Sequence, residues 1–149
     1  MARSPLSLCA AALSLLSLVS AGCNRQPPRP KVIKASGIVV VDGEPLESGY
    51  IQFIPENDRP ASAAIGPGGK FVLGTFGDDD GCVPGKHRIT VSSVDESNKT
   101  LRKFNAPPEY ADLLTSKLEM SVDEPTDALL VRLTWGGRKP TVEKVRPEL

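Results

Sequence analysis

Short segments in which apolar and polar residues alternate, separated by glycine- and proline-rich turns, constrain the fold of this chain most strongly. In "KHRITVSS", Ile89 and Val91 alternate with Arg88, Thr90 and Ser92. A period of two residues places successive side chains on opposite faces of a β-strand. The 13 glycines and 14 prolines of the chain break helices and favour turns. The pattern therefore predicts an all-β fold.

Seven such segments lie between residues 34 and 135. Along the chain, the expected strands cover 38–41, 50–55, 61–65, 70–75, 85–94, 116–122 and 128–135. Asp42-Gly43 is a strong signal for a hairpin turn. Several short strands joined by turns are typical of a sandwich. We therefore expect residues 34–135 to form one seven-stranded β-sandwich domain.

Two segments lack the strand pattern. Residues 95–116 are too long for a hairpin turn, and Pro107-Pro108 would end any strand there. The stretch "PEYADLL" can form one helical turn, because proline is accepted in the first turn of a helix. The tail, residues 136–149, combines glycine, proline and mixed charge without periodicity. We expect this tail to be disordered.

The amino-terminal residues 1–22 have the composition of a secretory signal peptide. Arg3 precedes an uncharged stretch that ends at Val19, and three small residues follow. The uncharged core has about fifteen residues, fewer than the roughly twenty that span a bilayer as a helix. This segment is therefore expected to direct export rather than to remain as a membrane span.

Val19-Ser20-Ala21-Gly22-Cys23 resembles the lipobox of bacterial lipoproteins, although Ser20 stands where that family usually has leucine. The resemblance implies that the peptide is cut before Cys23 and that the Cys23 thiol carries lipid, including palmitate. Two or more acyl chains hold a protein stably on a membrane. Cys23 is therefore the expected lipidation site. An ordinary signal peptide followed by a chance cysteine is the alternative.

Residues 23–33 are expected to form the lipid anchor and a proline-rich linker. Pro27, Pro28 and Pro30 favour an extended conformation, and "NRQPPRP" would hold the domain roughly 20 Å from the membrane. Asn24 is not aspartate, which by resemblance to lipoprotein sorting favours the outer membrane. We expect a bacterial envelope protein with its domain in the periplasm or at the cell surface.

The charge of the chain limits its expected binding partners, and its cysteine content limits the disulfides that it can form. Without residues 1–22, in which Arg3 is the one charged side chain, 17 basic residues face 18 acidic ones, a formal charge of −1. Because no global basic field exists, nucleic acid is not an expected partner. Cys9 leaves with the signal peptide and Cys23 carries lipid. Cys82 then has no partner for an internal disulfide.

A second resemblance covers residues 34–94. The stretches "SGIVVVDGEPLESGYIQFIP", "GGKFVLGT" and "DDDGCVPGKHRITVSSV" are similar to bacterial carboxypeptidase regulatory-like domains. Further along, "PPEYADLLTSKLEMSV" looks like the later part of small lipoproteins that carry this domain. The resemblance implies a transthyretin-like (prealbumin-like) sandwich. Most of the shared residues are turn residues, so they indicate a fold rather than an activity.

Asp78, Asp79 and Asp80 are the strongest candidates for a metal site. They crowd carboxylates before Gly81, as calcium loops do. A calcium loop, however, spaces its ligands at alternate positions and ends on a bidentate glutamate. We therefore expect a solvated turn whose carboxylates point into water, with no metal and no cofactor. A calcium-dependent binding module that uses this loop is the alternative.

No catalytic constellation is evident in the sequence. His87 is the only histidine, and its place in phase with Ile89 predicts a partly buried structural residue. Cys82 lies in no CxxC motif, and no serine lies in a Gly-x-Ser-x-Gly elbow. We expect a non-catalytic module that binds an envelope protein or glycan, or has a structural role. An envelope enzyme of unrecognised chemistry is the remaining alternative.

Overall fold

The computed structural model describes residues 28–145, and the predicted signal peptide and Cys23 lie outside this range. The described chain is all-β, as predicted, with two short 3-10 helices. The strands are β1 (Ala35–Val41), β2 (Glu44–Pro45), β3 (Gly49–Pro55), β4 (Ala61–Ile65), β5 (Lys70–Val72), β6 (Gly85–Ser92), β7 (Val94–Asp95), β8 (Leu101–Phe104), β9 (Leu118–Val122), β10 (Thr126–Leu133) and β11 (Val142–Lys144). The 3-10 helices are η1 (Pro67–Gly69) and η2 (Pro108–Ala111). Each of the seven expected segments contains a strand, β2, β8 and β11 are additional, and β7 begins at the last residue of the expected segment 85–94.

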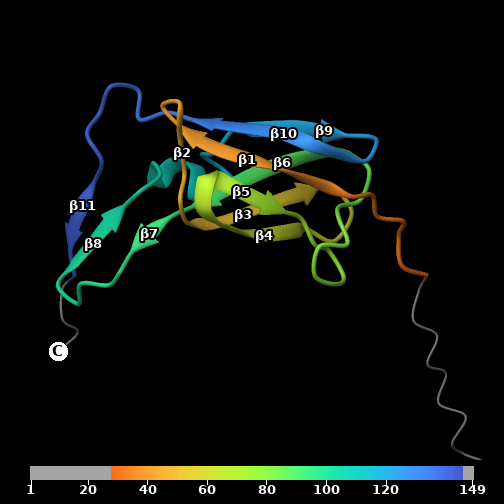
Figure 1. The fold of residues 1–149 in the computed structure, drawn as a ribbon, viewed down its shortest axis with the longest axis horizontal. Coiled ribbons are helices and arrows are strands. Elements are labelled where there is room, and N and C mark those ends of the chain that lie inside the picture. Colours follow the sequence, from red (N-terminus) through yellow and green to blue (C-terminus); the bar gives the residue numbers. More distant parts are fainter. Residues whose placement is uncertain (1–27, 146–149) are drawn as a thin grey trace, which may run out of the picture.

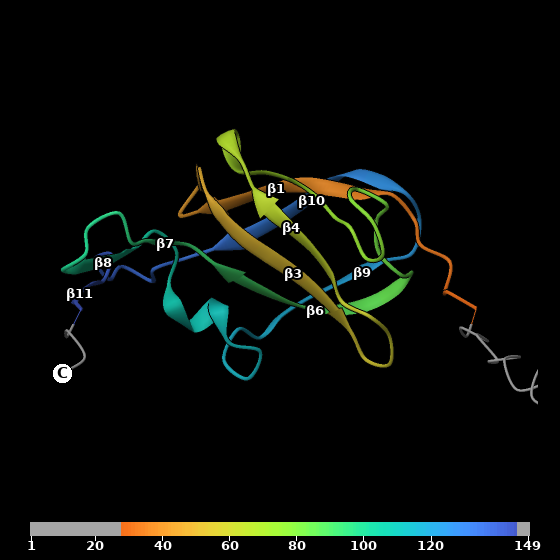
Figure 2. The ribbon, with the colours of Figure 1, turned by 90° about the horizontal axis from the view of Figure 1, so that it is seen from below.

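Two four-stranded sheets lie one over the other (Figures 1 and 2). One sheet is antiparallel, with the strand order β4-β3-β6-β9. In the other, β1 pairs with β10 along one side and with β2 and β5 along the other. The inner faces of both sheets contribute to a single apolar cluster. The arrangement is that of a sandwich with one core.

The alternation read from the sequence accounts for this core. Ile51 lies opposite Val91, and Phe53 lies opposite Ile89, on neighbouring antiparallel strands. All four side chains are at most 1% exposed. Residues directly opposite each other share a face, so each pair projects inward together. Burying a side chain of this size contributes about 1.5 to 3 kcal/mol.

The pairing of β1 with β10 is parallel, and it joins segments about 90 residues apart. A side chain at Gly37 would strain this pairing, because a Cβ there would lie 2.0 Å from the carbonyl oxygen of Leu129. Glycine is therefore required for the two backbones to approach. The Asp42-Gly43 turn that follows β1 also forms as predicted, with φ angles of 50° and 91°.

Strands β7, β8 and β11 form a separate three-stranded sheet, here called the small sheet, which projects from one end of the sandwich (Figure 1). The expectation of a disordered tail is wrong for β11, which pairs with β8. All three residues of β11 are exposed. Because no side chain is buried, the strand leaves no hydrophobic pattern in the sequence.

The segment between β8 and β9 contains η2, at the position where the sequence predicts a helical turn.

Within residues 28–145, no helix is long and apolar enough to cross a membrane.

The close approach at Gly37 predicts a large effect of a single methyl group. Gly37→Ala should lower the free energy of unfolding by about 2 to 3 kcal/mol, because the new Cβ must push β10 away from β1. Gly66→Ala is the matched control, since its Cβ would come no closer than 3.8 Å to any neighbour and its φ is −105°. We expect that variant to stay within about 1 kcal/mol of the unmodified chain. Urea unfolding followed by Trp135 fluorescence measures both, and equal losses would contradict the account.

Candidate functional site

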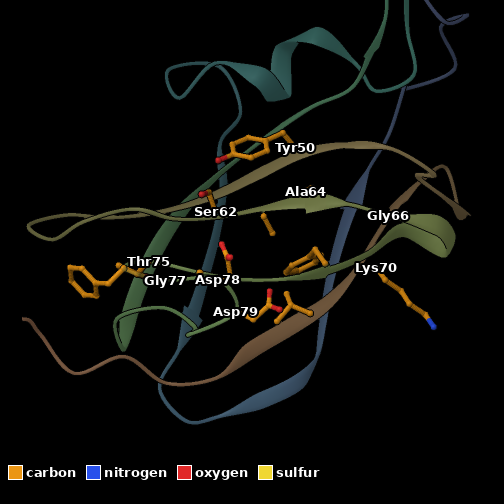
Figure 3. Close-up of a pocket in the computed structure, with 14 residues that line it drawn as sticks. Tyr50, Ser62, Ala64, Gly66, Lys70, Thr75, Gly77, Asp78 and Asp79 are labelled. Atoms are coloured by element: carbon orange, nitrogen blue, oxygen red, sulfur yellow. The ribbon is translucent and has the colours of Figure 1, made fainter.

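A groove of about 660 Å³ lies on the outside of the sandwich, where β4 and β5 meet (Figure 3). Small residues, Ala64, Gly66 and Gly74, leave its floor open. Tyr50, which is 44% exposed, and Phe76 supply aromatic rings to its lining. The remaining lining residues include Lys70, Val72, Asp78 and Asp79. Aromatic rings and charged groups over an open floor suit binding by stacking and hydrogen bonds.

Two backbone contacts hold the groove open at fixed width. At one end, Ser62 and Gly74 exchange hydrogen bonds of 2.9 and 3.0 Å. At the other end, the Gly66 N–H donates to the Lys70 carbonyl at 2.8 Å. Strands β4 and β5 belong to different sheets, so these contacts tie the two sheets together. Backbone hydrogen bonds between the two sheets therefore fix the shape of the groove.

Phe76 joins the groove to the linker. The guanidinium carbons of Arg29 and Arg59 lie 5.5 and 5.7 Å from the centroid of its ring. Both distances suit cation–π attraction. Since Arg29 belongs to the linker, the linker leaves the sandwich beside the groove. The groove thus lies at the end of the domain where residues 28–34 leave the sandwich.

The three aspartates of the loop after β5 do not act alike. The Asp80 carboxylate turns inward and accepts hydrogen bonds from the N–H groups of Thr75, Phe76 and Gly77, at 2.6 to 3.1 Å. Burial alone would raise the pKa of Asp80, but these donors and the nearby Lys34 ammonium outweigh it and hold that pKa below its ordinary value. The expectation that all three carboxylates point into water is therefore wrong for Asp80.

Asp78 and Asp79 are exposed and line the groove. Lys34 donates to the backbone carbonyl of Asp79 at 2.6 Å, which fixes the loop against β1. Among residues 28–145, no group of three or more His, Cys, Asp or Glu side chains is placed to hold a metal ion. Because Asp80 serves the loop backbone, the calcium alternative loses one of its three carboxylates.

His87 lies in the core, more deeply than predicted. It is 1% exposed, and its ring centroid lies 5.8 Å from that of Phe53. Neither ring nitrogen has a hydrogen-bond partner among the described residues. Burial lowers the pKa of His87, and the carbonyls of Gly85 and Val83 and the Asp123 carboxylate only partly oppose the shift. The lowered pKa favours the neutral imidazole, and almost none of the residue is exposed to solvent.

Cys82 is also closed off. It is fully buried and unpaired, and burial raises the pKa of its thiol to about 11. A thiol with this pKa stays protonated and is a poor nucleophile. Its backbone exchanges hydrogen bonds of 2.8 and 2.9 Å with Ile33. Gly81 permits this contact, because a Cβ there would lie 1.8 Å from the Ile33 carbonyl oxygen.

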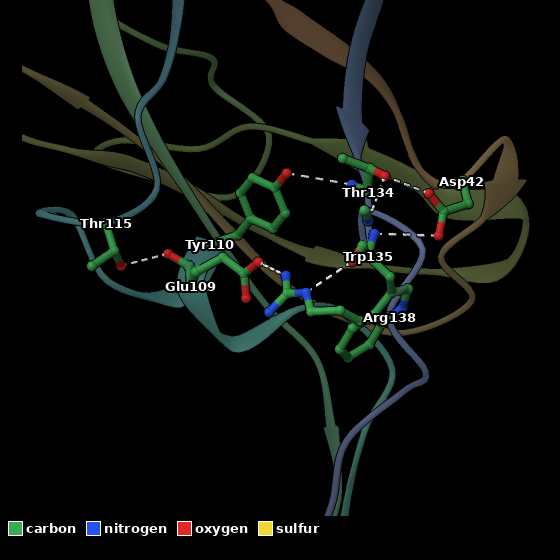
Figure 4. A network of polar contacts seen from close by, with 8 residues as sticks. Asp42, Glu109, Tyr110, Thr115, Thr134, Trp135 and Arg138 are labelled. Atoms are coloured by element: carbon green, nitrogen blue, oxygen red, sulfur yellow. Dashed lines mark hydrogen bonds and ion pairs between the residues drawn. The ribbon is translucent and has the colours of Figure 1, made fainter.

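A polar network at the other end of the sandwich has a structural role (Figure 4). Asp42 accepts hydrogen bonds from the Thr134 hydroxyl, at 2.6 Å, and from the Trp135 N–H, at 3.3 Å. Arg138 donates to the Trp135 carbonyl at 2.9 Å and forms an ion pair with Glu109. These contacts fasten the β1–β2 turn and η2 to the segment that leaves β10, and so fix the direction in which the chain runs to the small sheet.

Comparison of the chain with models of known protein families, with curated proteins and with solved structures finds no match.

The sequence indicated the aspartate loop but not the groove beside it. Neither Tyr50 nor Phe76 belongs to a sequence motif that points to a binding site. Their shared site forms because β4 and β5 meet there, and no local pattern reports this contact. Asp42 was predicted as a turn residue only. Its carboxylate reaches Thr134, which is 92 residues away along the chain.

The different roles of Asp80 and Asp78 can be tested by replacing each one with asparagine. Asp80→Asn should lower the free energy of unfolding by about 1 to 2 kcal/mol, because three N–H groups lose a charged acceptor. Asp78→Asn, which changes the same charge at an exposed position, should change it by less than about 0.5 kcal/mol. Urea unfolding measures both. Equal effects of the two substitutions would mean that Asp80 does not support the loop.

Burial of His87 predicts a pH-dependent stability. In the unfolded chain the imidazole takes up a proton near pH 6.5, whereas in the folded domain its lowered pKa keeps it neutral. The unfolded state then binds more protons, so the free energy of unfolding should fall below about pH 6.5, by at most about 1.4 kcal/mol per pH unit. Urea unfolding at pH 7.5 and 5.5 measures this loss. His87→Met should reduce it, and an unchanged pH dependence would contradict the assignment.

Proposed function

We propose that this chain is a bacterial envelope lipoprotein, anchored by lipid on Cys23, whose β-domain is a non-catalytic binding or structural module. The observation that carries the non-catalytic part is the burial of His87 and Cys82. His87 is the only imidazole of the chain, and Cys82 is the one thiol in the described residues. Neither can reach a substrate in the groove. Binding without covalent chemistry is what the exposed groups there support.

The short distance from Cys23 to the sandwich supports the anchoring part. Strand β1 begins at Ala35, twelve residues after Cys23. An extended chain of that length spans at most about 40 Å. Lipid on Cys23 would therefore keep the tethered end, with Phe76 and its groove, close to the membrane. The outer membrane is the favoured location because Asn24 follows the anchor.

For the fold, we propose a transthyretin-like sandwich of the carboxypeptidase regulatory-like type. Seven strands longer than two residues build the two packed sheets. The Asp42-Gly43 turn and the close approach at Gly81 fall within the segment that carries the resemblance. The turn needs Asp42-Gly43 and the close approach needs Gly81, so residues that carry the resemblance also have a physical role in this fold.

The groove is the proposed binding surface. Tyr50 offers a ring face, and Asp78 and Asp79 offer hydrogen-bond acceptors beside a floor without large side chains. A sugar ring or an extended peptide of an envelope protein fits this chemistry. A calcium-dependent form of the module gains no support from the loop geometry, because Asp80 serves the backbone.

Lipidation can be tested in a Gram-negative host that expresses the full chain. The chain should incorporate an alkyne analogue of palmitate and partition with membranes, because the thiol of Cys23 accepts the acyl groups. Cys23→Ala should abolish both labelling and partitioning. Cys82→Ala is the control for labelling of the other thiol. Labelling that survives in Cys23→Ala and disappears in Cys82→Ala would overturn the anchor.

The binding part is tested in the same host with a photoreactive phenylalanine analogue. Placed at Tyr50, it should form a crosslinked product in the envelope of cells that carry the lipidated chain. Placed at Leu114, which is 83% exposed and does not line the groove, it should form none. Equal products at the two positions would show that the groove is no binding surface.

A further inference from the structure

The small sheet has no core of its own. Every residue of β7 and β11 is exposed, and in β8 only Phe104 is partly covered. Four of the eight large apolar side chains that are exposed in residues 28–145 lie in or beside it: Val94, Leu101, Val142 and Val145. A three-stranded sheet gains stability only when it buries an apolar face. The small sheet is therefore an unusual concentration of uncovered apolar surface.

One face of the small sheet alternates lysine with aliphatic side chains. Leu101 lies opposite Lys144, and Lys103 lies opposite Val142. Opposite residues and residues two apart on a strand share a face, so all four side chains project to the same side. Asp95, which lies opposite Lys103, is the one carboxylate on this face of the three strands. It accepts a hydrogen bond from the Ser97 N–H at 2.9 Å.

The charge of this end of the molecule is basic, although the whole chain has a formal net charge of zero. The acidic side chains of the small sheet and its loops are Asp95, Glu96 and Glu143, against six basic ones. Arg102 forms an ion pair with Glu96, and Arg138 forms one with Glu109. Among the described residues, no ion pair involves the four exposed lysines, Lys99, Lys103, Lys139 and Lys144. The surface is complementary to a negatively charged ligand.

The outer edge of β11 can accept another strand. In the described chain β11 pairs only with β8. The Thr141 carbonyl accepts from Phe104 and the Val145 N–H donates to Thr100, so these two residues face β8. By alternation, the N–H and C=O groups of Val142 and Lys144 face away from β8. Val142 and Lys144 therefore provide two N–H donors and two C=O acceptors along the free edge of β11. Their side chains belong to the face on which lysine and aliphatic residues alternate.

We propose that the edge of β11 binds an extended acidic segment of a partner protein, which adds a fourth strand to the small sheet. A carboxylate of the segment would lie beside Lys144, and an aliphatic side chain two residues away would lie beside Val142. Main-chain hydrogen bonds supply affinity in this mode of recognition, and alternate side chains supply specificity. A second copy of this chain is a poor occupant, because it would add lysines to a face that already carries Lys103 and Lys144.

This proposal concerns the end of the molecule opposite the linker (Figures 1 and 2) and depends neither on Cys23 nor on the groove. The full chain in non-ionic detergent should bind a labelled nonapeptide in which glutamate and valine alternate on one face and threonine fills the other. Fluorescence anisotropy measures the binding, which should weaken as salt is added. A peptide with lysine in place of glutamate should not bind. Equal binding of the two peptides would overturn the proposal.

Two sets of variants separate strand addition from simple charge attraction. Lys103→Glu with Lys144→Glu should weaken binding about tenfold or more. Lys31→Glu with Lys117→Glu, the same double change at two exposed lysines outside both the small sheet and the groove, should leave it unaltered. Val142→Pro removes an outward N–H but no hydrogen bond to β8, so the small sheet should persist. This variant should also lose most of the binding. If it binds as well as the unmodified chain, no strand is added and the proposal fails.

An anionic lipid surface is the competing occupant. Vesicles that contain phosphatidylglycerol would bind through the same lysines but would not need the N–H of Val142. Binding to such vesicles that Val142→Pro leaves intact, together with no binding of the acidic peptide, would replace the proposal with a membrane-contact role. Circular dichroism of every variant should match that of the unmodified chain, since all the substituted side chains are exposed.

Discussion

The parallel pairing of β1 with β10 is the contact on which the rest of the molecule depends. Strand β1 lies inside its sheet and bonds to β10 on one side and to β2 and β5 on the other. The groove depends on it indirectly, because β5 forms one wall and is held in place by β1. The pairing itself requires that Gly37 have no side chain against the Leu129 backbone. The absence of a side chain at Gly37 thus lets β1 and β10 approach closely.

The two ends of the sandwich have different chemistry. At the linker end, two arginines flank Phe76, and a groove opens between sheets that are tied by backbone hydrogen bonds. At the far end, the Asp42 and Arg138 contacts direct the chain into a sheet with no buried side chains. His87 and Cys82 lie in the core between the two ends.

Local patterns in the sequence predicted local structure well. Ile89 and Val91 alternate because they face the core, and Asp42-Gly43 adopts positive φ angles because the β1–β2 turn needs them. Features set by distant contacts were not predictable in this way. No pattern in β1 says that its partner lies about 90 residues away and runs parallel. Three identical aspartates likewise cannot reveal that only Asp80 meets the N–H groups of residues 75–77. Strand β11 was missed because a strand with three exposed side chains has no apolar period.

The distance along the sequence between β1 and β10 also limits when their pairing can form. During synthesis β1 emerges first among the sandwich strands, but its partner is complete only after Leu133 has been made. Contacts between residues so far apart slow folding, because the entropy of closing the loop is lost before the contact forms. Until then the apolar side chains of β1, such as Val39, lack their final cover. Strand β1 can pair early with β2 and β5, but its last partner, β10, is also the last strand of the sandwich to be made.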